Sequence, residues 1–131
     1  MTILSCDQIF IHGIGDYITQ SDWMAQNKTK AHLPAFCHAL VYSLGFLMFT
    51  PSPLAWLVIF GMHFLIDRYR LARYIVWAKN FLGPRGGNPS FSDCAATGYP
   101  PSTPAWLSVW LMIIADNILH VAINGAALKF L

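Results

Sequence analysis

The sequence predicts an all-α integral membrane protein, a bundle of four helices that forms a single transmembrane domain over residues 1–131. Its composition is 56% hydrophobic and 15% aromatic, and only 11% of the residues are charged. This leaves too little polar surface to cover a soluble domain of the same length. Four apolar segments provide the helices. A chain this short can hardly enclose them in a core of its own, so lipid is the expected solvent.

The first two apolar segments are short. Residues 4–20 are interrupted by ionisable side chains and barely cross a hydrocarbon core of about 30 Å, so the first helix is the shortest. Residues 33–49 begin with Pro34 in the first turn, where the missing N–H costs little, and stop at the prolines of residues 50–53. These features predict a short second span and a tight turn into the third.

The third and fourth segments are longer. Residues 54–76 begin with a purely apolar half and continue into a half that carries three arginines, which predicts one long helix whose end emerges into water or headgroups. Residues 83–103 are dense in Gly, Pro and Ser and are expected to be a loop. Residues 104–131 supply the fourth span.

The distribution of basic residues predicts the orientation in the membrane. Seven of them fall on one side of the expected bundle and only Lys129 on the other; the seven are Lys28, Lys30, Arg68, Arg70, Arg73, Lys79 and Arg85. Basic residues near membrane spans stay in the cytoplasm. We therefore expect a multi-pass protein of a bacterial-type inner membrane, with both termini outside and the Gly/Pro-rich loop, between helices three and four, in the cytoplasm.

Charge and cysteine content exclude some classes of partner and site. The formal net charge is only +2, and no basic stripe interleaved with aromatic residues is present, so nucleic acid is not an expected partner. The three cysteines are odd in number and form no CxxC pair. Free thiols are therefore expected, rather than a disulfide framework or a thiolate zinc site.

Histidine and aspartate recur in pairs within the apolar segments. The pairs are His12 with Asp16, His63 with Asp67, and, in reversed order, Asp116 with His120. A separation of four residues puts both members on one helix face, and the reversed pair suits a helix that runs the opposite way. We expect the three carboxylates to share one pocket. His38 would join from the second helix, and the amides of Gln20, Asn27 and Asn117 would surround the cluster.

Such a cluster favours a divalent cation, because crowded carboxylates in a low dielectric need a compensating positive charge. Mixed His and Asp ligands suit zinc, manganese or iron. The candidate ligands are His12, Asp16, His38, His63, Asp67, Asp116 and His120. In the alternative interpretation the same side chains only hydrogen-bond neighbouring helices or pair with arginines. Gly13 and Gly15 are better explained by close helix contact than by a phosphate-binding loop.

The segment from His12 to Lys28 resembles the signature HxxxDFxxQxxxMAxxK. That signature belongs to a family of small bacterial and phage membrane proteins, which is classified only as a domain of unknown function. The similarity continues through residues 38–39, 63–67 and 116–120, which follow the family's HA, HFxxD and DQxxH elements in order. Tyr17 stands for the usual Phe and Asn117 for the usual Gln. The chain is also distantly similar to predicted membrane-bound metal-dependent hydrolases in its size and in placing His and Asp within helices, but it lacks their RGxTHS-type motif.

Two kinds of function remain open from the residues. One is a metal-dependent hydrolase that acts on a lipid-linked or headgroup substrate, with a metal-bound water as nucleophile and with Arg68, Arg70 and Arg73 holding a phosphate at the interface. The other is a non-enzymatic protein, either an ion or proton conduit or a phage or host membrane accessory factor. A coordination position of the metal left open to water would distinguish the two, because catalysis requires it and a closed structural site lacks it. The oligomeric state is left open.

Overall fold

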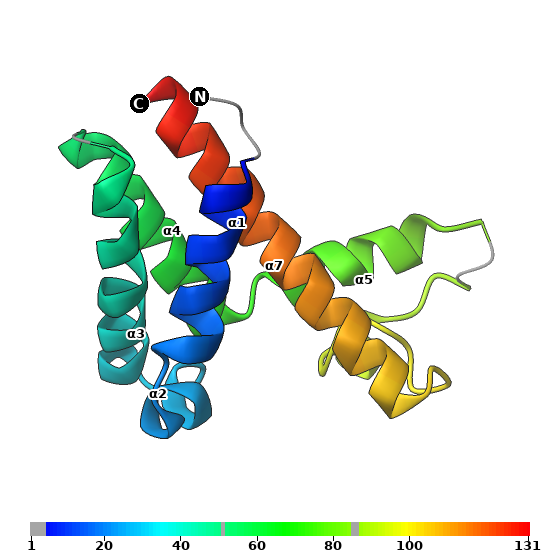
Figure 1. Ribbon diagram of the computed structural model, residues 1–131. Helices are drawn as coiled ribbons and strands as arrows, with labels where there is room; N and C mark the ends of the chain where they lie inside the picture. Colours follow the sequence, from blue (N-terminus) through cyan, green and yellow to red (C-terminus); the bar gives the residue numbers. More distant parts are fainter. Residues whose placement is uncertain (1–4, 51, 85–86) are drawn as a thin grey trace. The chain divides into compact units, whose positions relative to one another are not determined.

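The computed structural model describes residues 5–50, 52–84 and 87–131, and every regular element in these ranges is a helix (Figure 1). The chain divides into two compact units. Unit 1 is Met1–Tyr69 with His120–Leu131, and unit 2 is Arg70–Leu119. The expected start of the first span at Leu4, Pro51 of the expected turn and the basic residue Arg85 lie outside the described residues.

Unit 1 begins with helix α1 (Cys6–Gly13), which starts where the Ser5 side chain accepts a hydrogen bond from the Gln8 amide. The chain continues into one π-helical turn, η1 (Ile14–Ile18), in which the Thr19 amide donates to the Ile14 carbonyl. Such wide turns are frequent at functional sites because they re-aim a side chain. Helix α2 (Asp22–Asn27) follows, with the Ser21 hydroxyl as its N-terminal cap.

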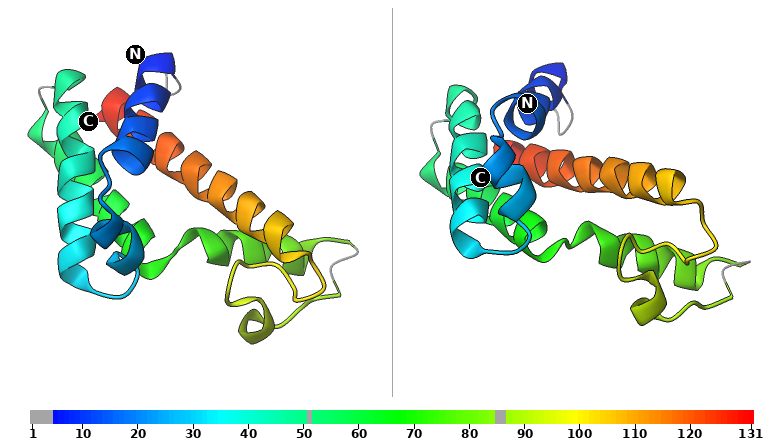
Figure 2. Two further views of the ribbon diagram at one scale, coloured as in Figure 1. Left: turned by 60° about the horizontal axis from the view of Figure 1, so that its bottom comes forward. Right: turned by 90° about the horizontal axis from the view of Figure 1, so that it is seen from below.

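The rest of unit 1 is an antiparallel helix pair that packs with α1 and the end of α7. Helix α3 (His32–Leu44) continues into a 3-10 turn, η2 (Gly45–Met48), and α4 (Pro53–Tyr69) returns beside it. The apolar core consists of Tyr42, Phe46, Ile59 and Ala127. Figure 2 shows α1 beside the C-terminal end of α7, where the Gln8 side chain donates to the Val121 carbonyl.

The prediction of one continuous helix over residues 54–76 is wrong. Helix α4 ends at Tyr69, and the next helix, α5 (Ala72–Leu82), begins two residues after Arg70, whose φ is 54°. A positive φ is uncommon for a residue with a β-carbon, and it interrupts the helical hydrogen-bond pattern. Unit 2 begins at this break in the helix.

The Gly/Pro-rich segment of unit 2 is an ordered loop that contains a short helix, α6 (Phe91–Cys94). The loop is held against α5 by side chains that donate to its carbonyls: Trp77 to Pro89, and Asn80 to Gly98. Gly98 has a φ of 82°, and a β-carbon there would lie 2.4 Å from the Arg73 carbonyl oxygen. Only glycine fits so close to the α5 backbone.

Helix α7 (Ala105–Phe130) is the one described helix long and apolar enough to cross a membrane, judged by its length and composition. An outward stripe at four-residue spacing consists of Trp106, Trp110, Ile114 and Ile118. The other three expected spans are shorter, with 8 residues in α1, 13 in α3 and 17 in α4. The π turn, the 3-10 turn and the helix break at Arg70 account for the shortening.

Candidate metal centre

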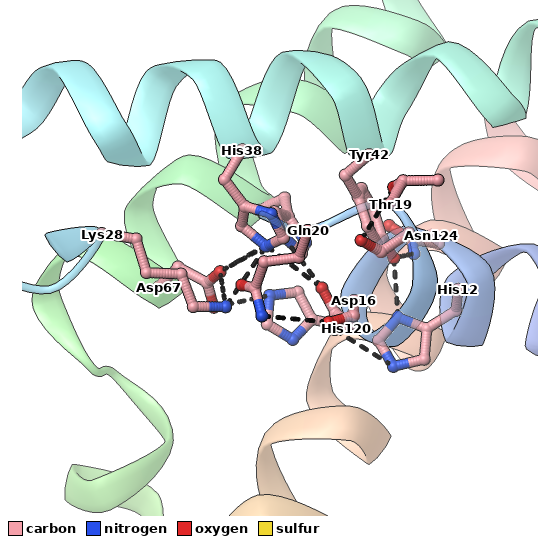
Figure 3. A network of polar contacts seen from close by, with 12 residues as sticks. His12, Asp16, Thr19, Gln20, Lys28, His38, Tyr42, Asp67, His120 and Asn124 are labelled. Carbon is pink, nitrogen blue, oxygen red and sulfur yellow. Dashed lines mark hydrogen bonds and ion pairs between the residues drawn. The ribbon is translucent and has the colours of Figure 1, made fainter. Parts of the chain in front are cut away.

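Four ligand atoms from three elements of unit 1 converge on one point. Asp16 comes from η1, His38 from α3, and both His63 and Asp67 come from α4. One nitrogen or oxygen of each lies within 4.8 Å of the others. All four side chains are buried, and none has more than 8% of its side-chain surface exposed. Figure 3 shows the network around them.

The distances between these atoms match the edges of a metal coordination polyhedron. The Nε2 atoms of His38 and His63 are 2.9 Å apart. Asp16 Oδ1 is 3.2 and 3.4 Å from these two nitrogens, and Asp67 Oδ2 is 3.1 and 3.3 Å from them. For metal–ligand bonds of about 2.0–2.1 Å, adjacent ligands lie about 2.9 Å apart around an octahedral ion and about 3.4 Å apart around a tetrahedral one. These five distances are compatible with one ion held among the four atoms.

A fifth group, the ammonium of Lys28, reaches the same cluster. Lys28 Nζ is 2.8 Å from Asp67 Oδ2 and 3.2 Å from His38 Nε2. Its side chain is 19% exposed, which makes it the most exposed member of the group. From the sequence, Lys28 was counted only among the basic residues that predict the orientation in the membrane. The available signal was its place at the end of the segment, His12 to Lys28, that resembles a family signature.

Two further histidines contact the outer oxygens of the same carboxylates. His12 Nε2 lies 3.6 Å from Asp16 Oδ2, and His120 Nε2 lies 3.7 Å from Asp67 Oδ1. The two outer rings stack on each other, with centroids 5.7 Å apart and an interplanar angle of 28°. Each carboxylate thus presents one oxygen to the inner group and the other to an outer histidine. His12 and His120 were among the seven residues predicted as ligands, and the structure places them beside the outer carboxylate oxygens.

Tyr42, which was not singled out from the sequence, holds the inner and outer histidines together. Its ring stacks on His63 at a centroid distance of 3.6 Å and an angle of 16°. Its hydroxyl is 2.8 Å from His12 Nδ1 and accepts a hydrogen bond from the Asn124 amide. The Nδ1 atoms of His38 and His63 have no hydrogen-bond partner among the described residues. Ring packing therefore orients these rings, and the only sequence signal was the position of Tyr42 one turn after His38.

The profile of a protein family described as "Protein of unknown function (DUF3307)" matches residues 4–84, which is more than half of the chain. The chain belongs to the DUF3307 family. The matched range contains all four inner side chains and Lys28, and it ends before α7. No curated protein and no solved structure matches the chain.

The amides that were expected around the cluster of this DUF3307 protein differ in what they contact. Gln20 donates to the backbone carbonyl of Asp16 and so supports the π turn that carries a candidate ligand. Asn27 donates to the Trp23 carbonyl of its own helix, and this hydrogen bond does not involve the cluster. Asp116 and Asn117 lie in the part of α7 that belongs to unit 2, where both are half-buried.

The three arginines expected to bind a headgroup each donate to a backbone carbonyl. Arg68 donates to Thr29, next to Lys28. Arg73 and Arg70 donate to the consecutive carbonyls of Ala95 and Ala96 in unit 2. These guanidinium groups anchor loops of the DUF3307 protein, a role that spacing along the sequence does not reveal.

Proposed function

We propose that this DUF3307 protein is a membrane protein that binds a divalent transition metal through Asp16, His38, His63 and Asp67. The observation that carries the proposal is the convergence of two imidazole nitrogens and two carboxylate oxygens at coordination distances within a buried cluster. Two carboxylates neutralise a divalent ion, and imidazole with carboxylate suits zinc, manganese or iron. Without an ion, the two buried carboxylates depend for counter-charge on the Lys28 ammonium, 2.8 Å from Asp67 Oδ2, and on the neighbouring histidines.

We further propose that the metal serves hydrolysis of a substrate carried by the membrane. An ion with four protein ligands keeps one or two positions for water when its coordination number exceeds four, and a bound divalent ion makes water acidic enough to act as hydroxide near neutral pH. Asp16, His38, His63 and Asp67 would hold the ion, and the ion would supply the activated water that hydrolysis consumes.

A closed structural ion is the second candidate function, and the deep burial of the four ligands favours it. Structural sites are fully coordinated by protein, whereas catalytic sites keep an exchangeable position. In a structural site the ion would stabilise the fold without contacting any exogenous ligand. The non-enzymatic alternatives considered from the sequence belong with this candidate.

Metal content tests the proposed site. The protein purified in detergent should contain close to one equivalent of a transition metal by elemental analysis, and His63→Ala should lose most of it, because the substitution removes one of four ligands. His32→Ala is the matched control. His32 begins the same helix as His38, is exposed, and packs on the rings of Phe64 and Tyr69 outside the cluster. Equal metal content in the two variants would refute this assignment.

Membrane integration, with the multi-pass inner-membrane placement expected from the sequence, is a separate part of the proposal. The length of α7, its outward apolar stripe and the shorter apolar stretch of residues 32–48 support membrane integration. The multi-pass placement in an inner membrane rests on the sequence alone. The protein should stay in the membrane pellet after alkaline carbonate extraction, because a spanning helix resists a treatment that releases interfacial proteins. A high-salt wash controls for electrostatic adsorption. Release into the carbonate supernatant would contradict the membrane assignment.

A further inference from the structure

We infer that the Lys28 ammonium marks the open coordination position of the metal site, and that this position, with Lys28 beside it, binds a phosphate group. The inference rests on the proposed metal site and adds the chemical class of its ligand. It is carried by the place of Lys28 Nζ among the inner ligand atoms and by the charge that the site would have once a metal is bound.

Lys28 Nζ lies beside two of the four ligand atoms, at distances typical of neighbouring ligands around one ion. Its distances to Asp67 Oδ2 and His38 Nε2, 2.8 and 3.2 Å, are in the range of the distances among the four ligand atoms themselves. A metal ion and an ammonium cannot both occupy contact positions around one carboxylate oxygen without strong repulsion. When the ion binds, Nζ must therefore withdraw, and the position that it leaves is adjacent to Asp67 and His38.

Lys28 can withdraw without leaving the neighbourhood of the site. It lies at the C-terminal cap of α2, and its flexible side chain is the most exposed of the group, so it leads from the buried cluster toward solvent. The backbone next to it is fixed, because Arg68 Nη1 donates to the Thr29 carbonyl at 2.9 Å. The lysine therefore remains close to the vacated position, and a ligand that enters there meets both the metal and the ammonium.

The charge of the loaded site selects an anion. A divalent ion cancels the two carboxylates, and the Lys28 ammonium then leaves a surplus positive charge in a largely buried place. Among anions, a phosphate group fits best, because its several oxygens can contact the metal and the ammonium at once, and lysine is a common phosphate-binding residue. A lipid headgroup and a free phosphate compound share this chemistry.

Cobalt substitution tests the inference, because the visible spectrum of Co²⁺ reports both metal binding and a change of ligand. Purified full-length protein in detergent is loaded with Co²⁺ and titrated separately with inorganic phosphate and with short-chain phosphatidic acid. We expect at least one of these probes to change the spectrum. A response to phosphatidic acid alone indicates a lipid headgroup, a response to inorganic phosphate alone indicates a soluble compound, and a response to both indicates recognition of the phosphate itself.

Lys28→Met should weaken binding of the responding probe by about tenfold or more, and it should tighten Co²⁺ binding, because a competing cation is removed. Lys30→Met, which removes an equal charge from an exposed lysine two residues away, should behave as the wild type in both measurements. Lys28→Gln repeats the test with a polar side chain, and circular dichroism establishes which variants are folded.

Failure of the inference is distinguishable from failure of the proposed metal site. If the wild type does not bind Co²⁺, the metal site itself is wrong. If Co²⁺ binds but neither probe changes the spectrum, or if Lys28→Met and Lys28→Gln bind the probe as tightly as Lys30→Met, the phosphate site is wrong and the metal site stands.

Discussion

Replacing Asp67 by asparagine should abolish metal binding and remove the metal-dependent part of the protein's thermal stability. Asp67 provides one inner oxygen, pairs with Lys28 through that oxygen and contacts His120 through the other. An ion bound only by the folded state stabilises it by mass action, by about 2.7 kcal/mol when free metal is about a hundredfold above Kd. The substitution should also destabilise the metal-free protein, because it removes the carboxylate that pairs with the partly buried Lys28 ammonium.

Thermal melts with added metal and with chelator measure both effects in detergent. The wild type should melt at a higher temperature with metal than with chelator, whereas Asp67→Asn should melt at one lower temperature in both conditions. Asp22→Asn is the matched control, because Asp22 is exposed and bonds only to Gln26 of its own helix in the described hydrogen-bond network. A metal-dependent shift of wild-type size in Asp67→Asn would show that the metal binds elsewhere.

Substituting alanine for Gly15 should both destabilise the protein and weaken metal binding. A β-carbon at Gly15 would lie 2.4 Å from Tyr42 Cδ2, so the tyrosine ring would have to move. That ring is buried and stacked on His63, which means that its displacement is transmitted to a proposed ligand. Overpacking of this kind costs about 1–3 kcal/mol.

Gly13→Ala is the control for this substitution, because a β-carbon there meets nothing within 4 Å. Alanine is the better helix former, so Gly13→Ala should leave the melting temperature unchanged or raise it. Melting temperature and metal affinity should be measured for both variants. Equal effects of the two substitutions would contradict the proposed dependence of the His63 position on Tyr42.

The helical class and part of the cluster follow from sequence periodicity. Because His63 and Asp67 are one turn apart on one helix, their approach needs only local geometry, and the structure places both in the inner group. The meeting of that pair with His38 and Asp16 depends on how α4 packs against α3 and η1, which spacing alone does not determine. The sequence could suggest that these residues meet, but it could not supply the distances between them.

Residue types could not predict which side chains take the inner positions of the cluster and which take the outer positions. A carboxylate has two oxygens, and only tertiary packing decides that one of them faces His38 and His63 while the other faces His12 or His120. Helix periodicity treats all members of the three pairs alike. For this reason the sequence predicted the seven candidate ligands as one set, and the inner and outer positions are known from the structure alone.

The helix break at Arg70 and the position of Lys28 in the cluster were not predicted, because both depend on contacts between residues far apart in the sequence. Helix breaks are normally signalled by glycine or proline, but here an arginine adopts the positive φ and donates to the Ala96 carbonyl, a contact made with a distant loop. Lys28 is one of several basic residues between apolar segments. Nothing in its local sequence shows that α2 directs it toward Asp67.

X-ray absorption spectroscopy at the edge of the bound metal tests the proposed site most directly, because it reports which atoms surround the ion. For protein purified with its metal, the proposed site predicts a shell of nitrogen and oxygen at about 2.0–2.1 Å, with the outer scattering of two imidazole rings and no sulfur. A spectrum without imidazole scattering, one with sulfur ligands, or protein that retains no metal would contradict the assignment of Asp16, His38, His63 and Asp67 as ligands.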